Sequence, residues 1–176
     1  MKKYIFTSAR LGFRTWEDAD LDTFSTMNAN PEIMHFFEKL LTREESKAKM
    51  DQMNQLFEKV GFCYFAVDYL PSDEFAGTLG LNRKDFPASF TPCVDIGWKF
   101  DKKFWNQGLA SEGAAACLEY AKKIGLKEIY SYASSANKAS RRVMEKIGMH
   151  FLEEFEHQEL LHCPQLQPFS VYQIRL

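Results

Sequence analysis

The chain has no long apolar run and no marked excess of one charge. None of its apolar stretches approaches the roughly 20 residues that a membrane-spanning helix needs. The N-terminal residues lack the apolar core and cleavage site of a secretory signal. The 22 lysines and arginines against 24 aspartates and glutamates give a net charge of −2, whereas nucleic-acid binding would favour a basic face. We therefore expect a cytoplasmic protein that binds neither membranes nor nucleic acids.

Cysteine is scattered, and several catalytic signatures are missing. Cys63, Cys93, Cys117 and Cys163 form no Cys-x-x-Cys pair and have no histidine at zinc-binding spacing, so we expect reduced thiols and no metal. No Gly-x-Ser-x-Gly nucleophile turn occurs, which argues against a covalent acyl-enzyme. No Gly-Lys-Ser or Gly-Lys-Thr follows a glycine-rich turn, which excludes a P-loop nucleotide site.

The length and the hydrophobic pattern predict one domain over residues 1–176. A chain of this size buries a sizeable core without disulfides or metal. The apolar periodicity, interrupted by glycine and proline, gives the order β-α-α-α-β-β-β-α-β-α-β-β, an α/β domain with a mixed sheet. The predicted strands are 9–14, 62–69, 75–81, 93–100 and 127–133, with two more in 149–176. The predicted helices are 17–28, a piece carrying Ile33, Met34, Phe36 and Phe37, a helix from the capping box Thr42-Arg-Glu-Glu45 to Gly61, 108–124 and 137–147, with a loop over 83–92.

Residues 94–113 are the most informative stretch: an apolar strand, a short polar turn, and a helix whose first turn carries small side chains. A helix leaves its first four N–H groups without partners, and its dipole places partial positive charge there. Gly108, Ala110 and Ser111 would let an anion approach those groups, although tight packing of helix on sheet would use the same residues. Farther on, Asn137-Lys-Ala-Ser140 opens a second helix. The small-residue turn, followed by an amide and a hydroxyl at the start of a second helix, indicates a ligand with a pyrophosphate and a reactive end.

Four segments occur in a particular order along the chain. They are Ser8-Ala-Arg-Leu-Gly-Phe-Arg-Thr-Trp-Glu-Asp-Ala-Asp20, Asp95-Ile-Gly-Trp98, Phe104-Trp-Asn-Gln-Gly-Leu-Ala-Ser-Glu112 and Asn137-Lys-Ala-Ser-Arg-Arg-Val-Met-Glu-Lys-Ile-Gly-Met149. Together they resemble the GNAT superfamily of acyl-CoA-dependent N-acyltransferases, and most closely its ribosomal-protein-alanine acetyltransferase-like branch. The resemblance covers essentially the whole chain. It implies a single GNAT-like domain with a mixed, mostly antiparallel sheet, splayed at the cofactor site and flanked by helices. We expect a monomer or a homodimer.

The resemblance also implies acetyl-CoA as co-substrate and names the residues that would bind it. Asn106 stands where the branch usually has glycine, so a positive φ is harder there, although asparagine tolerates it better than most residues. Asn137 would contact the pantetheine arm, but it is equally suited to cap the second helix. A backbone N–H near Phe100 would bind the acetyl carbonyl. The implied cofactor-binding residues are Trp98, Phe100, Gln107, Gly108, Leu109, Ala110, Ser111, Asn137 and Ser140.

Two residues are catalytic candidates. By resemblance, Ser140 would donate to the departing thiolate; the alternative is a merely solvated hydroxyl. Asp95 is the acid in the strand beside the acyl site, on the face shared with Gly97 and Lys99, and is the candidate base or amine anchor. The alternative for Asp95 is a carboxylate at the sheet surface. His157 is the second candidate base, although a lone histidine in a tail strand is more often structural.

The function that follows is transfer of an acetyl group from acetyl-CoA to a primary amine, by direct attack in a ternary complex. The acceptor would be a protein N-terminus or a small amine, because sequences of this kind include both. A non-catalytic acyl-CoA-binding sensor or scaffold is the alternative from another class. It would keep the phosphate turn, and the presence of Asn137 and Ser140 at the acyl end argues against it.

Overall fold

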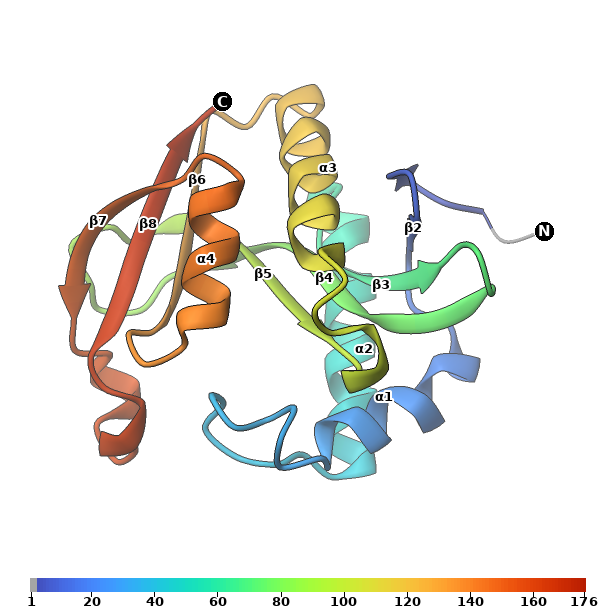
Figure 1. Ribbon diagram of the computed structural model, residues 1–176, viewed down its shortest axis with the longest axis horizontal. Coiled ribbons are helices and arrows are strands. Elements are labelled where there is room, and N and C mark those ends of the chain that lie inside the picture. The colour runs from blue at the N-terminus through green and yellow to red at the C-terminus, as the bar shows by residue number, and fades with distance from the viewer. Residues whose placement is uncertain (1–2) are drawn as a thin grey trace.

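The computed structural model describes residues 3–176 (Figure 1). These residues form one eight-stranded mixed sheet in the spatial order β1-β2-β3-β4-β5-β6-β8-β7. This confirms the fold class expected from the resemblance. The strands are β1 (Phe6–Thr7), β2 (Leu11–Arg14), β3 (Tyr64–Tyr69), β4 (Glu74–Lys84), β5 (Cys93–Phe100), β6 (Glu128–Ser134), β7 (His150–Phe155) and β8 (Phe169–Arg175), and the α-helices are α1 (Leu21–Asn28), α2 (Arg43–Val60), α3 (Leu109–Lys123) and α4 (Lys138–Lys146). No helix among residues 3–176 is long and apolar enough to cross a membrane.

The sheet is antiparallel except near its centre, where two strands separate. β4 and β5 pair along their length, from Gly77 with Phe100 to Lys84 with Cys93. β5 and β6 are parallel and share a single register pair, Asp95 with Tyr130. Beyond that pair the strands diverge, so the half of β5 that leads to Phe100 has no strand beside it on that edge. The predicted splay is therefore confirmed.

Helices cover both faces of the sheet. α3 and α4 lie in front of it in Figure 1 and α2 lies behind. The core under α3 contains Leu11, Phe65, Leu79, Leu109, Cys117 and Ala121, all at most 1% exposed. α2 starts with the predicted capping box: the Glu45 N–H donates to Thr42 Oγ1 at 3.1 Å, and the Thr42 N–H donates to the Glu45 carboxylate at 2.8 Å. Gly61 ends α2 at φ 79°, as predicted.

A buried ion cluster fixes the segment that precedes α1. The Arg14 guanidinium is 3% exposed and contacts the carboxylates of Asp20 at 2.7 Å and Asp68 at 2.8 Å. Each carboxylate accepts two hydrogen bonds from it, so the buried positive charge is fully surrounded by acceptors. Because Asp20 immediately precedes α1, this cluster ties the start of that helix to β2 and β3.

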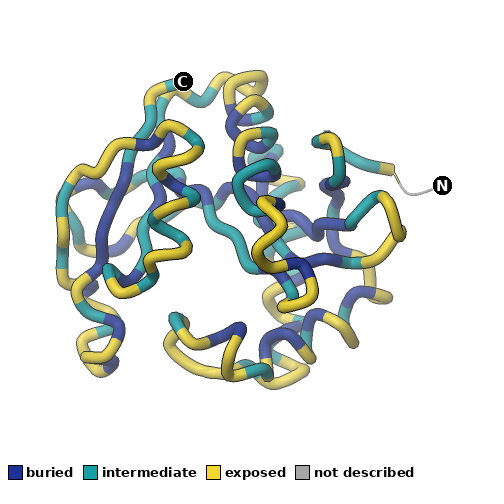
Figure 2. The backbone as a smooth tube through the Cα atoms, viewed as in Figure 1, coloured by how far each residue is buried: buried dark blue, intermediate teal, exposed yellow. Residues whose placement is uncertain are grey.

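The helical piece predicted after Pro31 is wrong. Residues 30–41 form turns, with the Met34 N–H donating to the Asn30 carbonyl at 3.0 Å and the Phe37 N–H donating to the Met34 carbonyl at 2.9 Å. Ile33, Phe36 and Phe37 have the spacing of one helix face, but the turns do not extend into a helix, because nucleation is unfavourable and the segment is short and mostly exposed. Ile33 and Met34 are buried, whereas most of the segment is exposed (Figure 2). We call residues 30–41 the acceptor-side loop.

Smaller differences concern element ends. β1 is too short to predict from alternation, the helix expected over 17–28 begins with a 3₁₀ turn at Asp18–Asp20, and β4 continues three residues beyond the predicted strand, to Lys84. The tail supplies two strands, as predicted, and the loop between them contains 3₁₀ turns at Gln158–Leu160 and Pro164–Leu166.

Candidate active site between two cavities

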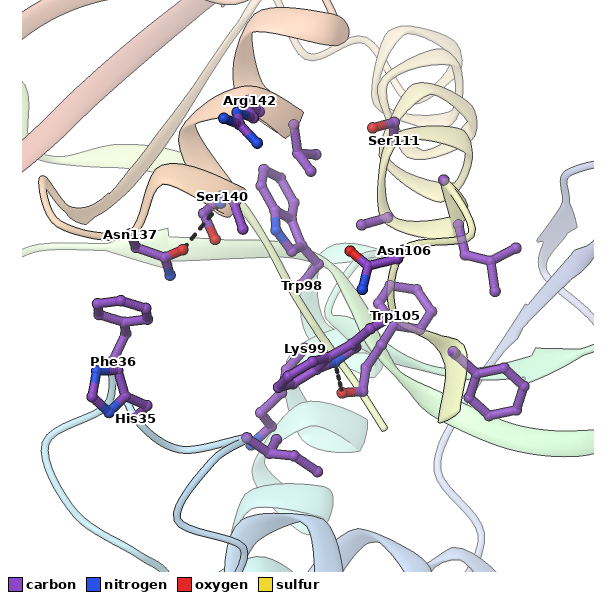
Figure 3. Close-up of a pocket in the computed structure, with 18 of the residues that line it drawn as sticks. His35, Phe36, Trp98, Lys99, Trp105, Asn106, Ser111, Asn137, Ser140 and Arg142 are labelled. Atoms are coloured by element: carbon purple, nitrogen blue, oxygen red, sulfur yellow. Dashed lines mark hydrogen bonds between the residues drawn. The ribbon is translucent and has the colours of Figure 1, made fainter. Parts of the chain in front are cut away.

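The turn before α3 has a backbone suited to binding an anion. Asn106 has φ 59° and Gly108 has φ 75°, so both adopt the left-handed conformation. Gly108 is the N-cap, has no side chain to occupy the helix end, and accepts from the Glu112 N–H at 3.0 Å. The N–H groups of the first helical turn are therefore directed at the space before the helix. That space is a cavity of about 650 Å³, the first cavity, which Asn106, Gly108, Ala110 and Ser111 help to line (Figure 3).

A salt bridge holds this turn against the sheet. The Glu112 carboxylate accepts from Arg10 Nε at 2.7 Å, from the Arg10 backbone N–H at 2.8 Å and from Ser8 Oγ at 2.7 Å. Arg10 Nη2 also donates to the Gln107 carbonyl at 3.0 Å. These bonds lower the pKa of Glu112 and keep it ionised. Arg10 and Glu112 are positioning residues for the turn.

The splayed half of β5 directs backbone groups into the same cavity. The Asp101 N–H donates to the Ala76 carbonyl on β4 at 2.9 Å, whereas the Ile96 carbonyl accepts from Ser131 Oγ on β6 at 2.8 Å. Since peptide groups alternate along a strand, those of Trp98 and Phe100 point away from β4. The Phe100 carbonyl accepts from the indole Nε1 of Trp105 at 2.9 Å. Trp98 and Phe100 both line the first cavity.

The start of α4 forms the opposite wall. Asn137 Oδ1 accepts from the Ser140 N–H at 3.1 Å, so Asn137 caps the helix. Capping uses only the oxygen, and the amide nitrogen of the same side chain remains a donor on the cavity side. Figure 3 shows Asn137, Ser140 and Arg142 facing Asn106 and Ser111, with Trp98 between them. Arg142 and Lys146, four residues apart on one helix face, bring two cations to this wall.

A second cavity, of about 670 Å³, adjoins the first. Both cavities are lined by Trp98, Lys99, Asn137 and Ser140, so the predicted acyl site lies where they meet. The second cavity extends along the other part of β5 to Asp95 and toward the C-terminal segment. Phe36 and Phe37 of the acceptor-side loop also line both cavities.

Asp95 is buried, which rules out the surface-carboxylate alternative. It is 4% exposed, and both of its oxygens lie 2.7 Å from the donating hydroxyl of Tyr64. Lys84 Nζ is 4.0 Å away. Burial raises the pKa of Asp95 to about 6, with Lys84 and the Tyr64 hydrogen bond opposing the rise. The Tyr64 ring lies over Gly97, where a Cβ would stand 3.2 Å from its hydroxyl oxygen.

Lys99 is a half-buried lysine on the face of β5 that carries Asp95, and its sequence pattern predicts no role for it. Its Nζ donates to Asn28 Oδ1 and lies 5.2 Å from the ring centre of Phe24 and 5.0 Å from that of Phe37. Partial burial, together with the positive charge of Lys49, lowers the pKa of Lys99 to about 7. Lys99 therefore links the end of α1 and the acceptor-side loop to the strand that carries the acyl site.

The predicted site residues come together with one exception. Trp98, Phe100, Gly108, Leu109, Ala110, Ser111, Asn137 and Ser140 line the first cavity, and Asp95 and His157 line the second. Gln107 lies outside both linings: its side chain donates to the Lys103 carbonyl at 2.7 Å. Sequence reasoning missed Tyr64, Lys99 and Arg142. Only Arg142 left a readable signal, its four-residue spacing from Lys146 on the predicted helix.

The first cavity fits coenzyme A in its chemistry. It offers free helix N–H groups for a pyrophosphate, two exposed cations for phosphate charge, and unpaired strand backbone for an amide-containing arm. Among residues 3–176, no group of three or more His, Cys, Asp or Glu side chains is placed to hold a metal ion.

Comparisons with known proteins agree with this geometry. A family model described as the acetyltransferase (GNAT) domain matches residues 10–150. The chain is 46% identical over 146 residues to YnaD of Bacillus subtilis (strain 168), named as an uncharacterized N-acetyltransferase, covering 81% of each protein. An acetyltransferase from Agrobacterium tumefaciens str. C58 superposes with a TM-score of 0.81 at 20% identity, over 100% of this chain and 96% of that one. RimL, a ribosomal L7/L12 alpha-N-protein acetyltransferase in complex with coenzyme A, superposes with a TM-score of 0.79 at 16% identity, over 99% of this chain and 98% of that one. The chain belongs to the GNAT acetyltransferase family.

Proposed function

We propose that the chain, as a single domain over residues 1–176, transfers an acetyl group from acetyl-CoA to a primary amine by direct attack in a ternary complex. One observation carries this proposal: the two cavities meet at Trp98, Asn137 and Ser140. One cavity has the chemistry to bind coenzyme A, and the other ends at a buried carboxylate. A thioester and an amine that enter from opposite sides would meet there without a covalent enzyme intermediate.

On the coenzyme side, the N–H groups at Gly108 to Ser111 would bind the pyrophosphate, and Arg142 and Lys146 would attract phosphate charge. The free peptide groups of Trp98 and Phe100 would pair with the pantetheine arm, and the Phe100 N–H would bind the acetyl carbonyl. The Phe100 carbonyl would first have to exchange its bond with Trp105 for one with the arm. The α3 turn that makes these contacts is held by the Arg10–Glu112 pair.

On the acceptor side, Asp95 would take the proton that the attacking amine loses. As the new C–N bond forms and the C–S bond breaks, the Ser140 hydroxyl would stabilise the leaving thiolate as a hydrogen-bond donor. With a pKa of about 6, Asp95 is mostly ionised at neutral pH and is a stronger base than an exposed aspartate. The buried carboxylate in the acceptor cavity argues against the non-catalytic acyl-CoA-binding alternative, which has no need of a base.

Thiol release from acetyl-CoA tests the proposal. The wild-type protein is incubated with acetyl-CoA and a panel of small amines and peptides with varied N-termini, and each product is identified by mass spectrometry. We expect amine-dependent release of coenzyme A with one acetyl group gained by the acceptor. Tight coenzyme A binding without release over the whole panel would overturn the proposal and support a binding module.

A further inference from the structure

Three buried polar atoms have no hydrogen-bond partner among residues 3–176: Thr78 Oγ1, Ser134 Oγ and His157 Nδ1. All three residues line the second cavity. Ser134 is 1% exposed and His157 is 5% exposed, so solvent does not readily replace the missing partners. Buried polar groups are almost always paired in folded proteins, and an unpaired one destabilises the fold. Three such groups in the wall of one cavity call for an explanation specific to that cavity.

Buried serines outside the lining of this cavity are paired. Ser46 Oγ donates to the Thr42 carbonyl at 2.8 Å, and Ser170 Oγ lies 2.7 Å from Ser135 Oγ. Ser131 also lines the cavity, but its hydroxyl donates to the Ile96 carbonyl at 2.8 Å, so the unpaired hydroxyl of Ser134 is specific to its place at the end of β6.

Ser134 and His157 lie close to the predicted acyl site. Ser134 ends β6, and its carbonyl accepts from the Asn137 N–H at 2.8 Å. Phe169 faces Ser134 in the β6–β8 register, and its ring centre is 5.5 Å from that of His157. His157 also stacks on Phe86, with ring centres 4.2 Å apart. Ser134 Oγ and His157 Nδ1 thus belong to one end of the cavity, whose walls are otherwise aromatic. We call this end the polar end, after these two unpaired atoms.

The polar end suits an uncharged ligand group. Burial lowers the pKa of His157, which favours a neutral ring, and the charges that act on it, Lys84 and Glu159, oppose each other. The nearby carboxylate of Asp95 already has Tyr64 and Lys84 as partners. A charged ligand group would lose its hydration there without gaining a free countercharge. A hydroxyl or amide would gain hydrogen bonds from atoms that otherwise have none.

We propose, on the basis of the acetyl transfer proposed above, that the acceptor is a small primary amine that also carries a hydroxyl or amide group, which hydrogen-bonds to Ser134 and His157 at the polar end. The size of the cavity is in the range that encloses small molecules. Ser134 and His157 are then specificity-determining residues for the acceptor, and Thr78 faces the same ligand from β4.

Matched pairs of amines test this assignment. Ethanolamine is compared with propylamine, glycinamide with isobutylamine, and tyramine with phenethylamine, by kcat/KM for thiol release. A lost hydrogen bond to a buried site typically lowers the rate constant by about tenfold. We expect the polar member of at least one pair to be preferred by that factor, and Ser134→Ala and His157→Phe to reduce the preference to about twofold or less. Phenylalanine preserves the stacking on Phe86.

Ser170→Ala is the matched control, because it removes a buried serine hydroxyl that has a partner and lies outside the cavity lining. Ser170→Ala should show the same preference for the polar amines as the wild type. The apo protein gives a second readout: Ser134→Ala should raise Tm, because it removes an unpaired polar group, whereas Ser170→Ala should lower it. A fall in Tm for Ser134→Ala would mean that its hydroxyl is satisfied by the protein, and would overturn the assignment.

Failure of this inference is distinguishable from failure of the proposed function. Thiol release without preference for the polar amine, a preference that survives both variants, or turnover confined to peptides would overturn the inference alone. Calorimetry of the same amines in the presence of coenzyme A measures binding without turnover. Selective binding that depends on Ser134 but gives no thiol release would support the polar end and overturn acetyl transfer. Neither binding nor release in any pair, together with no thiol release with the peptides, would overturn both.

Discussion

Replacing Asp95 with asparagine should make the protein more stable at neutral pH. Burial raises the pKa of Asp95 from 3.8 to about 6, so ionising this carboxyl opposes folding. A rise of that size corresponds to about 3 kcal/mol once both the folded and unfolded states are ionised. Asparagine is similar in shape, can accept from the Tyr64 hydroxyl through its Oδ1, and carries no charge. Asp95→Asn therefore removes the unfavourable ionisation and keeps one of the hydrogen bonds.

The effect has a definite pH dependence. Because the folded-state pKa is higher than the unfolded one, the folded state binds the Asp95 proton more tightly. The stability that this provides is complete below pH 3.8 and is lost as the pH rises through about 6. The advantage of Asp95→Asn should therefore grow by about 2.5 kcal/mol between pH 4 and pH 7.5, or about 5–10 °C in Tm.

Urea unfolding of the apo protein at a series of pH values measures this difference. Other carboxyl groups are common to both proteins and cancel when the two curves are subtracted. Asp22→Asn is the control: Asp22 is an exposed carboxylate on α1 that pairs with Arg43, and its substitution should change stability by less than about 0.5 kcal/mol at any pH. A wild-type-minus-variant difference that does not vary with pH would refute the burial argument for Asp95.

Four further tests follow. In the enzymatic reaction, Asp95→Asn should lower the rate mainly below the pKa of the acceptor amine and recover as the pH rises; a pH–rate profile parallel to the wild type would exclude Asp95 as the base. Ala110→Glu should abolish most of the stabilisation by coenzyme A, which is about 2.7 kcal/mol at a hundredfold excess over Kd, whereas Ala115→Glu, on the exposed face of the same helix, should retain it in a thermal shift assay; equal shifts would contradict the phosphate assignment. Ser140→Ala should lower kcat at least about tenfold with little change in acetyl-CoA affinity, and a smaller loss would leave Ser140 as a solvated hydroxyl. Lys99→Met should stabilise the apo protein most below pH 7 and less toward pH 10, because the half-buried lysine has a pKa lowered to about 7 and its protonation below that pH opposes folding; a gain that is constant with pH would contradict this.

The coenzyme side of the site could be predicted from the sequence because it is local. A turn of small residues followed by a helix leaves the first N–H groups of that helix unpaired and accessible, and this does not depend on the rest of the chain. The positive φ considered at Asn106 is present, at 59°, and Asn137 both caps α4 and faces the cavity. Each of these features depends on residues within about one helical turn of each other.

The side proposed for the acceptor could not be predicted in the same way, because it depends on the register between neighbouring strands. Tyr64 reaches Asp95 across β4: it lies opposite Gly80 on β4, and Gly80 lies opposite Gly97 on β5. The absence of a side chain at Gly97 leaves room for the ring, whose hydroxyl donates to the carboxylate. No spacing within one segment encodes this arrangement. The same holds for Lys99, whose contacts come from α1 and the acceptor-side loop.

The burial of Asp95, as the proposed base, also constrains which amines the site would use. Moving a proton from an amine of pKa about 7.7–8.0 to a carboxylate of pKa about 6 is unfavourable by about 2.5 kcal/mol, whereas an amine of pKa about 10.4 requires about 6 kcal/mol. An α-amine has the lower pKa because of the electron-withdrawing amide beside it. The hydroxyl or amide that Ser134 and His157 would bind has the same effect when it lies near the amine. The polar end and the proposed base would thus select for the same property, so among acceptors of equal size we expect turnover to fall as amine basicity rises.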